Sequence, residues 1–428
     1  MALLVQKYGG TSVGTPERIQ AVARRVVRAR RRGDDVVVVV SAMGHTTDEL
    51  IDLTHKVVGH GDGTREHPRE MDMLLSAGER ISMALLAMAI REAGADARSL
   101  TGSQAAIITD ESHTAARIVE VRADRVRDTL DDGVVAIVAG FQGVSTAREI
   151  TTLGRGGSDT TAVALACALD ADRCEIYTDV DGIFTCDPRR VPGARVVRRI
   201  SHAEMVEMAQ SGAQVMHARA VDLGGRYGMD IRVLSSFVDG PDSDDPNRGT
   251  LITKNPMAME DLVLTGIASS RGYAKLILRG LPPGMRTPTD MLVALADAGV
   301  SVDMVTEAPD VDGRILLQLT VREDDLARAK EVAAEVAGRL GGGGATEERG
   351  GLSRIALVGS GMSGRPGVYA QAYRTLLQAG VEVEAVSTSS ISITLLVPAE
   401  GEDAALRALH AGFSLERPAE VPAGAAAG

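Results

Sequence analysis

The run of five valines at residues 36–40 constrains the fold of this chain more than any other segment. A strand that is apolar at every position has no face for solvent, so helices must cover both of its sides, as in parallel sheets. Further strand-like runs occur at 3–6, 105–109, 134–139 and 175–178, and helical patterns at 16–32, 69–92, 114–131 and 158–169. Residues 1–250 are therefore predicted to form an α/β domain with a mostly parallel central sheet.

Beyond about residue 250 the chain contains two segments that echo each other. AGVSVDMV at 298–305 is similar to AGVEVEAV at 379–386, and each lies downstream of a Pro-Gly step. Each unit reads strand, turn, helix, glycine, strand, which indicates an internal duplication with a period of about 80 residues. We expect the first unit at 262–340 and the second at 352–417, with a strand near 251–262 as a candidate to complete the second. A flexible linker is expected at 341–350 and a disordered tail at 418–428.

Composition and charge exclude several classes of function. The net charge of −12 disfavours nucleic acid as a partner, because its backbone selects Lys and Arg surfaces. Cys167, Cys174 and Cys186 are too few for a disulfide framework, and no histidine lies at metal-ligand spacing from them. The N-terminus lacks the pattern of a secretory signal, and no apolar run approaches the ~20 residues of a membrane helix. We expect a cytoplasmic protein without a metal site built from its own side chains.

The motif KYGGTS at residues 7–12 follows one predicted strand and precedes a helix. Gly9 and Gly10 lack Cβ atoms, so their backbone N–H groups can approach phosphate oxygens, and the helix N-terminus adds positive potential. Lys7 can neutralise a phosphoryl group in transfer. The spacing is neither a Walker A loop nor a dinucleotide fingerprint. Taken alone, the motif is equally compatible with an ordinary glycine turn.

Two longer motifs strengthen the case for a phosphate site. TTLGRGGSDTT at 151–161 opens a predicted helix, and Arg155 offers a planar fork that matches a carboxylate. YTDVDGIFTCDPR at 177–189 follows a strand, and its aspartates could serve a magnesium nucleotide or merely cap turns. Glu79, within GERIS at 78–82, could pair with a substrate ammonium or make an ordinary helix-surface pair.

Taken together, these motifs resemble those of the aspartate kinases in the amino-acid kinase superfamily. The resemblance covers essentially the whole chain and includes SAMG at 41–44 and GFQG at 140–143, and the two C-terminal units look like the paired ACT domains of this family, each a ferredoxin-like βαββαβ unit. It implies transfer of the ATP γ-phosphate, with Mg²⁺, to the β-carboxylate of L-aspartate. The product, 4-phospho-L-aspartate, begins lysine, threonine and methionine biosynthesis.

The resemblance also implies roles for individual residues. Lys7 would stabilise the transferring phosphoryl group and Asp159 would hold Lys7. The implied substrate-binding residues are Thr47, Glu79, Arg155, Gly156, Gly157 and Ser158. The implied ATP-binding residues are Lys7, Tyr8, Gly9, Gly10, Ser41, Thr178, Asp179, Phe184, Thr185, Asp187, Pro188, Arg189 and Gln214. The implied allosteric residues are Ser301, Asp303, Glu307, Met362, Ser363, Ser387, Thr388 and Ser389.

The family resemblance implies a homodimer or larger oligomer, with amino-acid effectors at the ACT units. Met257 and Met259 precede the regulatory region, so a separately translated regulatory subunit is also conceivable, as in some relatives. No membrane partner is expected.

The sequence departs from the family pattern at several positions. Gln214 stands where the family often has lysine, which predicts a lower affinity for ATP. In the first ACT unit, Leu281 and Pro282 replace an acidic residue, and Glu307 and Ala308 replace Gln-Asn. Ser390 stands in the second unit where Glu is common. These changes predict weakened or altered feedback control.

Three alternatives remain open on the sequence alone. A paralogous kinase could act on another amino-acid carboxylate in a specialised pathway. A catalytically idle amino-acid sensor is a different class of protein, but it would have no physical reason to keep Lys7, Arg155 and Asp159 together. A nucleotide-binding structural protein is the weakest of the three.

Overall fold

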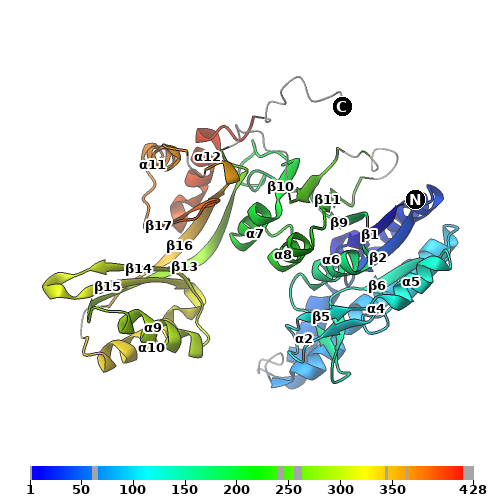
Figure 1. Ribbon diagram of the computed structural model, residues 1–428, viewed down its shortest axis with the longest axis horizontal. Coiled ribbons are helices and arrows are strands. Elements are labelled where there is room, and N and C mark those ends of the chain that lie inside the picture. The colour runs from blue at the N-terminus through cyan, green and yellow to red at the C-terminus, as the bar shows by residue number, and fades with distance from the viewer. Residues whose placement is uncertain are drawn as a thin grey trace. The chain divides into compact units, whose positions relative to one another are not determined.

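The computed structural model describes residues 2–59, 66–238, 245, 247–254, 263–342, 346–362 and 365–417. The chain divides into two compact units (Figure 1). Unit 1 consists of Met1–Thr185 and Arg195–Met259, and unit 2 of Cys186–Ala194 and Glu260–Gly428.

Unit 1 is built on an eight-stranded sheet with the order β10-β12-β11-β9-β1-β2-β6-β3. Every pairing in it is parallel except the one between β11 and β12. The mostly parallel sheet that the sequence predicts is therefore confirmed. Its strands are β1 (Leu3–Tyr8), β2 (Asp35–Val40), β3 (Ala97–Leu100), β6 (Val135–Ala139), β9 (Arg173–Thr178), β10 (Arg199–Ser201), β11 (Ile231–Ser235) and β12 (Thr250–Thr253).

Helices cover both faces of this sheet (Figure 1). Val36, Val38 and Val40 pack into a core with the apolar sides of α1 and α4. On the other face, α6 packs against β1 and β2. All five valines of 36–40 are fully buried, as their uniform pattern requires. The helices of unit 1 are α1 (Pro16–Arg31), α2 (Thr46–Val58), α4 (Pro68–Glu92), α5 (Asp124–Asp131), α6 (Gly157–Leu169), α7 (His202–Gln210) and α8 (Ala218–Tyr227).

A second, four-stranded sheet in unit 1 corrects two sequence predictions. Its order is β5-β4-β7-β8, formed by Ile118–Val121, Ile107–Thr109, Gln142–Ser145 and Ile150–Thr152 respectively. The run at 105–109 therefore does not join the central sheet. The helix predicted at 114–131 is wrong in its first half, because Ile118–Val121 pairs as a strand with β4. Helix α5 begins only at Asp124, after Ala123 turns the chain with a left-handed φ of 55°.

Helix α4 has the length and composition of a membrane span, the only such helix within the described ranges. Half of the apolar window is nevertheless buried inside unit 1, as in the core helix of a globular domain. Burial against the sheet accounts for the apolar residues on one side of the helix, such as Leu86 and Ile90, whereas Ile81 and Met88 are exposed.

Unit 2 contains a six-stranded sheet with the order β14-β15-β13-β16-β18-β17, in which every pairing is antiparallel. The chain passes twice through the same βαββα order, so the predicted duplication is confirmed. The first half comprises β13 (Gly266–Leu281), α9 (Arg286–Asp297), β14 (Val302–Pro309), β15 (Ile315–Arg322) and α10 (Leu326–Arg339). The second comprises β16 (Thr346–Val358), α11 (Val368–Gln378), β17 (Ala385–Thr388), β18 (Ser392–Pro398) and α12 (Glu402–Gly412).

Two boundary predictions are corrected in unit 2. Residues 346–350, expected to be linker, form the start of β16 and pair with β13. A strand near 251–262 was expected to complete the second half. The part of this segment that the structure describes belongs to β12, which pairs with β10 and β11 in the sheet of unit 1. The first part of β13 pairs with β16 in its place. Residues 255–262, 343–345 and 418–428 lie outside the described residues.

The segment Cys186–Ala194 leaves unit 1 and is part of unit 2. A backbone hydrogen bond from Thr185 N to Arg195 O, 2.9 Å long, closes the base of this excursion. Cys186 and Val191 are buried in the apolar core between α11, α12 and the sheet. Arg190 forms ion pairs with Glu402 and Asp403 at the start of α12. The excursion is thus an integral part of unit 2.

Candidate active site

Four of the sequence motifs meet at one edge of the central sheet. They follow β1, β2, β6 and β9, which are parallel neighbours, so their carboxyl ends line up where such sheets bind ligands. Backbone hydrogen bonds tie the turns together. Ser41 N donates to Tyr8 O at 3.1 Å, Gly44 N to Gly10 O at 3.1 Å, and Gly9 N to Tyr177 O at 3.3 Å.

Lys7 and Asp159 form the central ion pair of this edge, with Nζ 2.6 Å from Oδ1. The two side chains are only 12% and 10% exposed. Asp159 lies in the first turn of α6, whose N-cap is Gly156 in the left-handed region, with φ 68° and no side-chain cap. Free N–H groups and the dipole at such a helix start favour an anion. Gly9 passes beside the ammonium, since a Cβ added there would lie 3.5 Å from Lys7 Nζ.

Two glycines in the motifs are required by close packing. A Cβ on Gly10 would lie 2.9 Å from the carbonyl oxygen of Ala42, and one on Gly156 would lie 2.2 Å from Cβ of His217. Real Cβ atoms do not approach that closely, so larger residues would separate the turns. The glycines therefore bring the backbone of neighbouring turns into contact at the site.

Glu79 supplies a buried carboxylate next to the turn after β2. Its side chain is 3% exposed, and Oε1 accepts a hydrogen bond from Ala42 N at 3.1 Å. Oε2 is buried and has no hydrogen-bond partner within the described part of the chain. Burial raises the pKa of Glu79 to about 7, against the lowering effect of hydrogen bonds from its own backbone and that of Ala42. A buried acceptor of this kind is costly unless a ligand satisfies it.

The other predicted substrate residues surround the start of α6 or lie in α2. Arg155 is exposed in the turn between β8 and α6, and its guanidinium has no ion-pair or hydrogen-bond partner among the residues described. Gly157 and Ser158 are buried in the first turn of α6. Thr47 lies half-buried in the first turn of α2.

The predicted nucleotide residues divide into two groups. Thr178, half-buried at the end of β9, donates to Asp179 Oδ1 at 3.2 Å. Phe184, which forms a β-bridge with Val196, and Thr185 are the last residues of unit 1 before the excursion. Tyr8 is fully buried and stacks on Tyr177 with ring centroids 4.7 Å apart. Only the backbone of Tyr8 can therefore contact a ligand.

The remaining predicted nucleotide residues lie in unit 2 or in a turn between two helices of unit 1. Asp187, Pro188 and Arg189 belong to the excursion that is part of unit 2, where Arg189 pairs with Asp187 at 2.9 Å. Gln214 is exposed in the turn between α7 and α8. Gln214 precedes His217 by three residues, and His217 packs on Gly156 at the start of α6.

The predicted allosteric residues lie at opposite edges of the sheet in unit 2. Asp303 and Glu307 are on edge strand β14, and Ser301 directly precedes it. Ser387 and Thr388 are on the other edge strand, β17, and Ser389 directly follows it. Met362 is buried in the core against α11, and Ser363 lies outside the described residues. One chain therefore does not bring the two groups into a single pocket.

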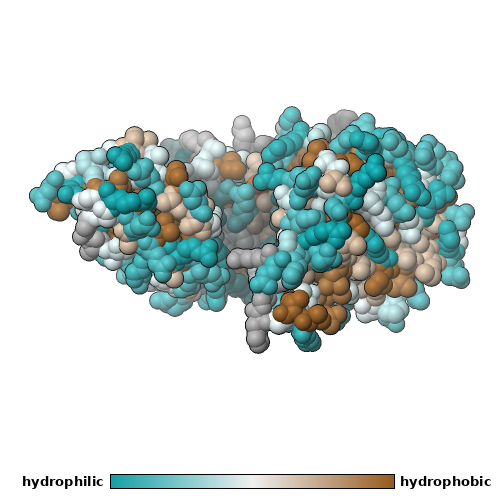
Figure 2. Space-filling model, turned by 90° about the horizontal axis from the view of Figure 1, so that it is seen from below, coloured by the Kyte–Doolittle hydropathy of each residue, from teal (hydrophilic) through white to brown (hydrophobic). Residues whose placement is uncertain are grey.

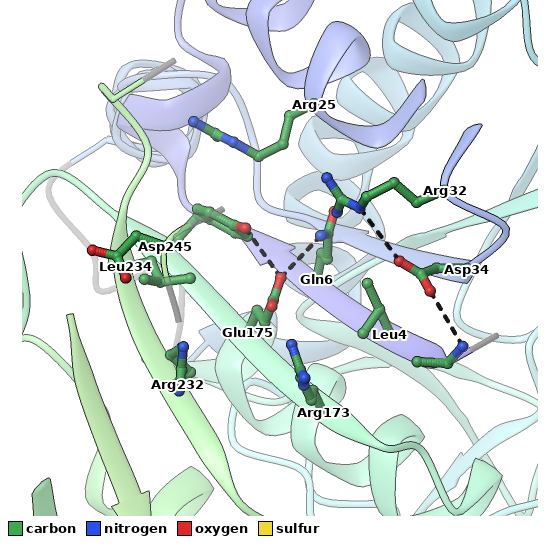
Figure 3. Close-up of a pocket in the computed structure, with 12 residues that line it drawn as sticks. Leu4, Gln6, Arg25, Arg32, Asp34, Arg173, Glu175, Arg232, Leu234 and Asp245 are labelled. Atoms are coloured by element: carbon green, nitrogen blue, oxygen red, sulfur yellow. Dashed lines mark hydrogen bonds and ion pairs between the residues drawn. The ribbon is translucent and has the colours of Figure 1, made fainter. Parts of the chain in front are cut away.

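A cavity of about 280 Å³ in unit 1 is separate from these residues (Figure 3). Glu175 lies at its centre, where Oε2 accepts hydrogen bonds from Gln6 Nε2 at 2.9 Å and from the Tyr177 hydroxyl at 3.0 Å. Arg25, Arg32, Arg173 and Arg232 contribute to its lining. None of the predicted site residues lines it, so this cavity is not the candidate active site.

Sequence reasoning missed two residues next to the Arg155 turn, Asp72 on α4 and Arg219 on α8. Both make hydrogen bonds to the segments that precede Arg155. His113 also contacts Asp72, with Nδ1 2.6 Å from Oδ2. No local pattern distinguishes these side chains, because their partners are 41 to 103 residues away in the sequence.

The fold and the site define an α/β small-molecule kinase that is followed by a duplicated ferredoxin-like regulatory unit. Sequence models described as the amino acid kinase family and as an ACT domain match residues 2–235 and 355–413. An aspartokinase of Mycolicibacterium smegmatis is 47% identical over 420 residues, which cover 97% of each chain. The chain therefore belongs to the amino acid kinase family and, within it, to the aspartokinases.

Two solved structures of E. coli aspartokinase III are similar to the whole chain. The complex with aspartate and ADP, in the R-state, is 26% identical with a TM-score of 0.78 and covers 96% of this chain and 99% of that one. The complex with lysine and aspartate, in the T-state, is 25% identical with a TM-score of 0.70 and the same coverage.

Proposed function

We propose that this protein is an aspartate kinase that transfers the γ-phosphate of ATP to the β-carboxylate of L-aspartate and releases 4-phospho-L-aspartate and ADP. The observation that carries the proposal is the buried Glu79 carboxylate, whose Oε2 has no partner in the described chain and lies beside the glycine turns. A substrate ammonium is the cation that would satisfy it. The E. coli relative crystallised with aspartate and ADP supports the choice of substrate and nucleotide.

In this proposal two charged side chains bind the substrate. Glu79 binds the ammonium of aspartate and Arg155 its α-carboxylate, with a fork geometry that lysine does not offer. Thr47, Gly156, Gly157 and Ser158 line the space between them. An amino acid is thereby oriented with its side-chain carboxylate toward Lys7 and the start of α6.

The chemistry requires positioning and charge neutralisation rather than a general base. The attacking carboxylate is already anionic, so no proton has to be removed before one of its oxygens attacks the γ-phosphorus. Lys7, held by Asp159, neutralises charge on the transferring group, and the backbone N–H group of Gly10 binds one of its oxygens, while Gly9, whose N–H donates to Tyr177 O, lets the chain pass beside the ammonium. The bond to the β-phosphate oxygen breaks, and ADP leaves.

Magnesium fits the donors that the site offers. Within the described residues there is no cluster of three or more His, Cys, Asp or Glu side chains that could cage an ion. Mg²⁺ instead takes one or two carboxylates together with nucleotide phosphates, and the exposed Asp179 and Asp181 after β9 are oxygen donors of that kind. Bound there with ATP, the ion would neutralise charge on the phosphates.

We also infer that the chain assembles with further copies of itself and binds amino-acid effectors at its regulatory unit. The edge strands β14 and β17 expose unpaired backbone groups that normally find a partner. Apolar side chains also gather on one face of unit 1 (Figure 2), from α2 and α4. The exposed members of that face are Leu53, Val57, Val58, Met73, Ile81, Leu85 and Met88. The three cysteines are free, which agrees with a cytoplasmic location.

An acyl-phosphate trap tests the proposed function directly. Purified protein is incubated with ATP, Mg²⁺ and hydroxylamine over a panel of amino acids, and the hydroxamate and ADP are both measured. We expect hydroxamate from L-aspartate and little from glutamate or from aspartate lacking its α-amino group. A different preferred amino acid would show that the chain is a paralogous kinase, and no product with any amino acid would favour an idle sensor.

A further inference from the structure

The turn that carries Arg155 lies directly against a second turn of unit 1. The second turn spans residues 113–116, and Ala116 N donates to Thr152 O at 2.9 Å. Gly154 packs closely on it, since a Cβ added there would lie 3.1 Å from Thr114 O. The position of Arg155 thus depends on how firmly these two turns are joined.

Asp72 joins the two turns from the α4 side. Its side chain is completely buried, and Oδ1 accepts hydrogen bonds from Thr114 N at 3.0 Å and from the Thr152 hydroxyl at 2.5 Å. Oδ2 lies 2.6 Å from His113 Nδ1. One carboxylate therefore binds both turns at once, and burial without these partners would be very unfavourable.

Arg219 joins the same two turns from α8. Its Nη1 donates to Leu153 O at 3.1 Å and its Nη2 to Ala116 O at 2.9 Å. Both acceptors are backbone carbonyl oxygens, one in each turn. The planar fork of arginine can hold two such oxygens in a fixed relation, which the single ammonium of lysine cannot do.

We propose that Asp72 and Arg219 are positioning residues that clamp the 152–155 turn to the 113–116 turn and thereby fix where Arg155 presents its guanidinium. Arg155 itself is exposed and has no partner in the described chain, so the position of its guanidinium depends on where the backbone of the turn lies. The proposal rests on the proposed function, in which Arg155 reads the α-carboxylate of aspartate. Because the hydrogen bonds of Asp72 and Arg219 go to these two turns, we expect each residue to act on substrate binding through Arg155.

Arg219→Lys and Asp72→Asn test the clamp, with Arg226→Lys and Asp132→Asn as matched controls. Arg226 and Asp132 form exposed ion pairs in the same unit. The clamp variants should raise KM for aspartate by about ten-fold, the loss typical of a misplaced charge-assisted contact, with KM for ATP almost unchanged. The controls should change neither value. An equal rise in both KM values, or no rise in either, would overturn the proposal.

A double variant shows whether Arg219 acts through Arg155. In an Arg155→Lys background, Arg219→Lys should raise KM for aspartate by less than about two-fold further, because residues that act as a unit are not additive. Full additivity would assign Arg219 a role of its own and refute the clamp. Thr152→Val, which removes one hydroxyl from Asp72, replaces Asp72→Asn if that variant does not fold.

Hydrogen exchange separates failure of the clamp from failure of the proposed function. Amides of 113–116 and 152–156 should exchange faster in Arg219→Lys than in the wild type, while those of β1 and β2 should not. This readout needs no substrate. Unchanged exchange would contradict the proposed clamp even if the protein is an active kinase. Faster exchange in a protein that does not phosphorylate aspartate would contradict only the proposed function.

Discussion

Lys7 at the end of β1 and Asp159 in the first turn of α6 face each other, with Nζ 2.6 Å from Oδ1. The ammonium is therefore held in place by a partly desolvated carboxylate before any ligand arrives. Fixed charge of this kind stabilises a transition state without the cost of reorganising solvent at the moment of reaction. The pair also joins the glycine turn to the helix start, so one contact aligns two anion-binding elements.

Lys7→Ala and Asp159→Ala should each lower kcat by about 10²- to 10³-fold, since removing one preorganised electrostatic group costs about 2.7–4 kcal/mol. Steady-state kinetics with ATP and aspartate measure this, and KM should change less than kcat. Lys330→Ala is the control, because Lys330 forms an exposed ion pair with Glu348 in unit 2. Near-normal turnover in either site variant would refute the assigned roles.

Aspartate binding should depend on pH through Glu79, whose pKa burial raises to about 7. The ionised fraction of such a group grows about ten-fold between pH 6 and pH 8, so KM for aspartate should fall by about ten-fold over that range. Glu79→Gln should raise KM and abolish this dependence, while Glu92→Gln, an exposed change on α4, should leave the profile intact. A pH-independent KM in the wild type would contradict the role of Glu79.

The same carboxyl group has an effect of opposite sign on stability. Its folded-state pKa is raised above the ordinary 4.5, so its contribution to the free energy of unfolding is fully present below pH 4.5 and is lost as pH rises through about 7. In the absence of ligand, the wild type should therefore lose stability relative to Glu79→Gln between pH 5 and pH 8. Chemical denaturation at both pH values measures the difference.

Feedback inhibition by threonine and lysine, alone or together, should be weak or absent at millimolar concentrations. Leu281, at the position where the family resemblance led us to expect an acidic residue, is buried in the core of the first regulatory half and cannot pair with an ammonium. Each lost charge-assisted hydrogen bond forfeits about 1.5–3 kcal/mol, as much as the usual coupling between sites. Assays with threonine, lysine, both, and methionine decide it. Strong inhibition well below about 1 mM, a concentration equivalent to about 4 kcal/mol of binding, would show that exposed Glu307 on β14 has taken over the contact.

The protein should be a dimer or a larger closed oligomer at micromolar concentration. The edge strands β14 and β17 and the apolar face of α2 and α4 are exposed in one chain, and contact with further copies would bury them. Light scattering measures the mass. Val386→Lys on β17 and Ile81→Lys on α4 each place a charge on one of these surfaces, and the variant that lowers the mass identifies the contact. A monodisperse monomer in the wild type would contradict the assembly.

The central sheet and the motif loops are predictable from sequence because their signals are local. An all-valine run must form a strand that is buried on both faces. A glycine turn between a strand and a helix identifies the carboxyl edge of a sheet. The prediction for segment 114–131 fails because its apolar residues fit both the helical period of 3.6 residues and the strand period of two residues. Pairing of Ile107 with Val121, together with the left-handed backbone of Ala123, decides for a strand there.

The clamp residues could not have been found in this way. Asp72 lies on the buried side of an apolar helix, and its partners at Thr114 and Thr152 are brought near only by the folded second sheet. Arg219 donates to backbone carbonyl oxygens, which every residue possesses and no sequence pattern reveals. The excursion at Cys186–Ala194 is similarly hidden, since its motif reads as part of the nucleotide loop.

That excursion means the two units cannot be separated by a single cut in the chain. A fragment that ends at Met259 would carry Cys186 and Val191 without the core that buries them, and one that begins there would have a gap in that core. Translation from Met257 or Met259 would therefore yield a regulatory subunit with an open apolar slot beside which Asp403 has lost its partner Arg190, while Glu402 keeps only Arg271. Such a subunit would be a poor monomer and a ready acceptor for an insert that only the full-length chain encodes.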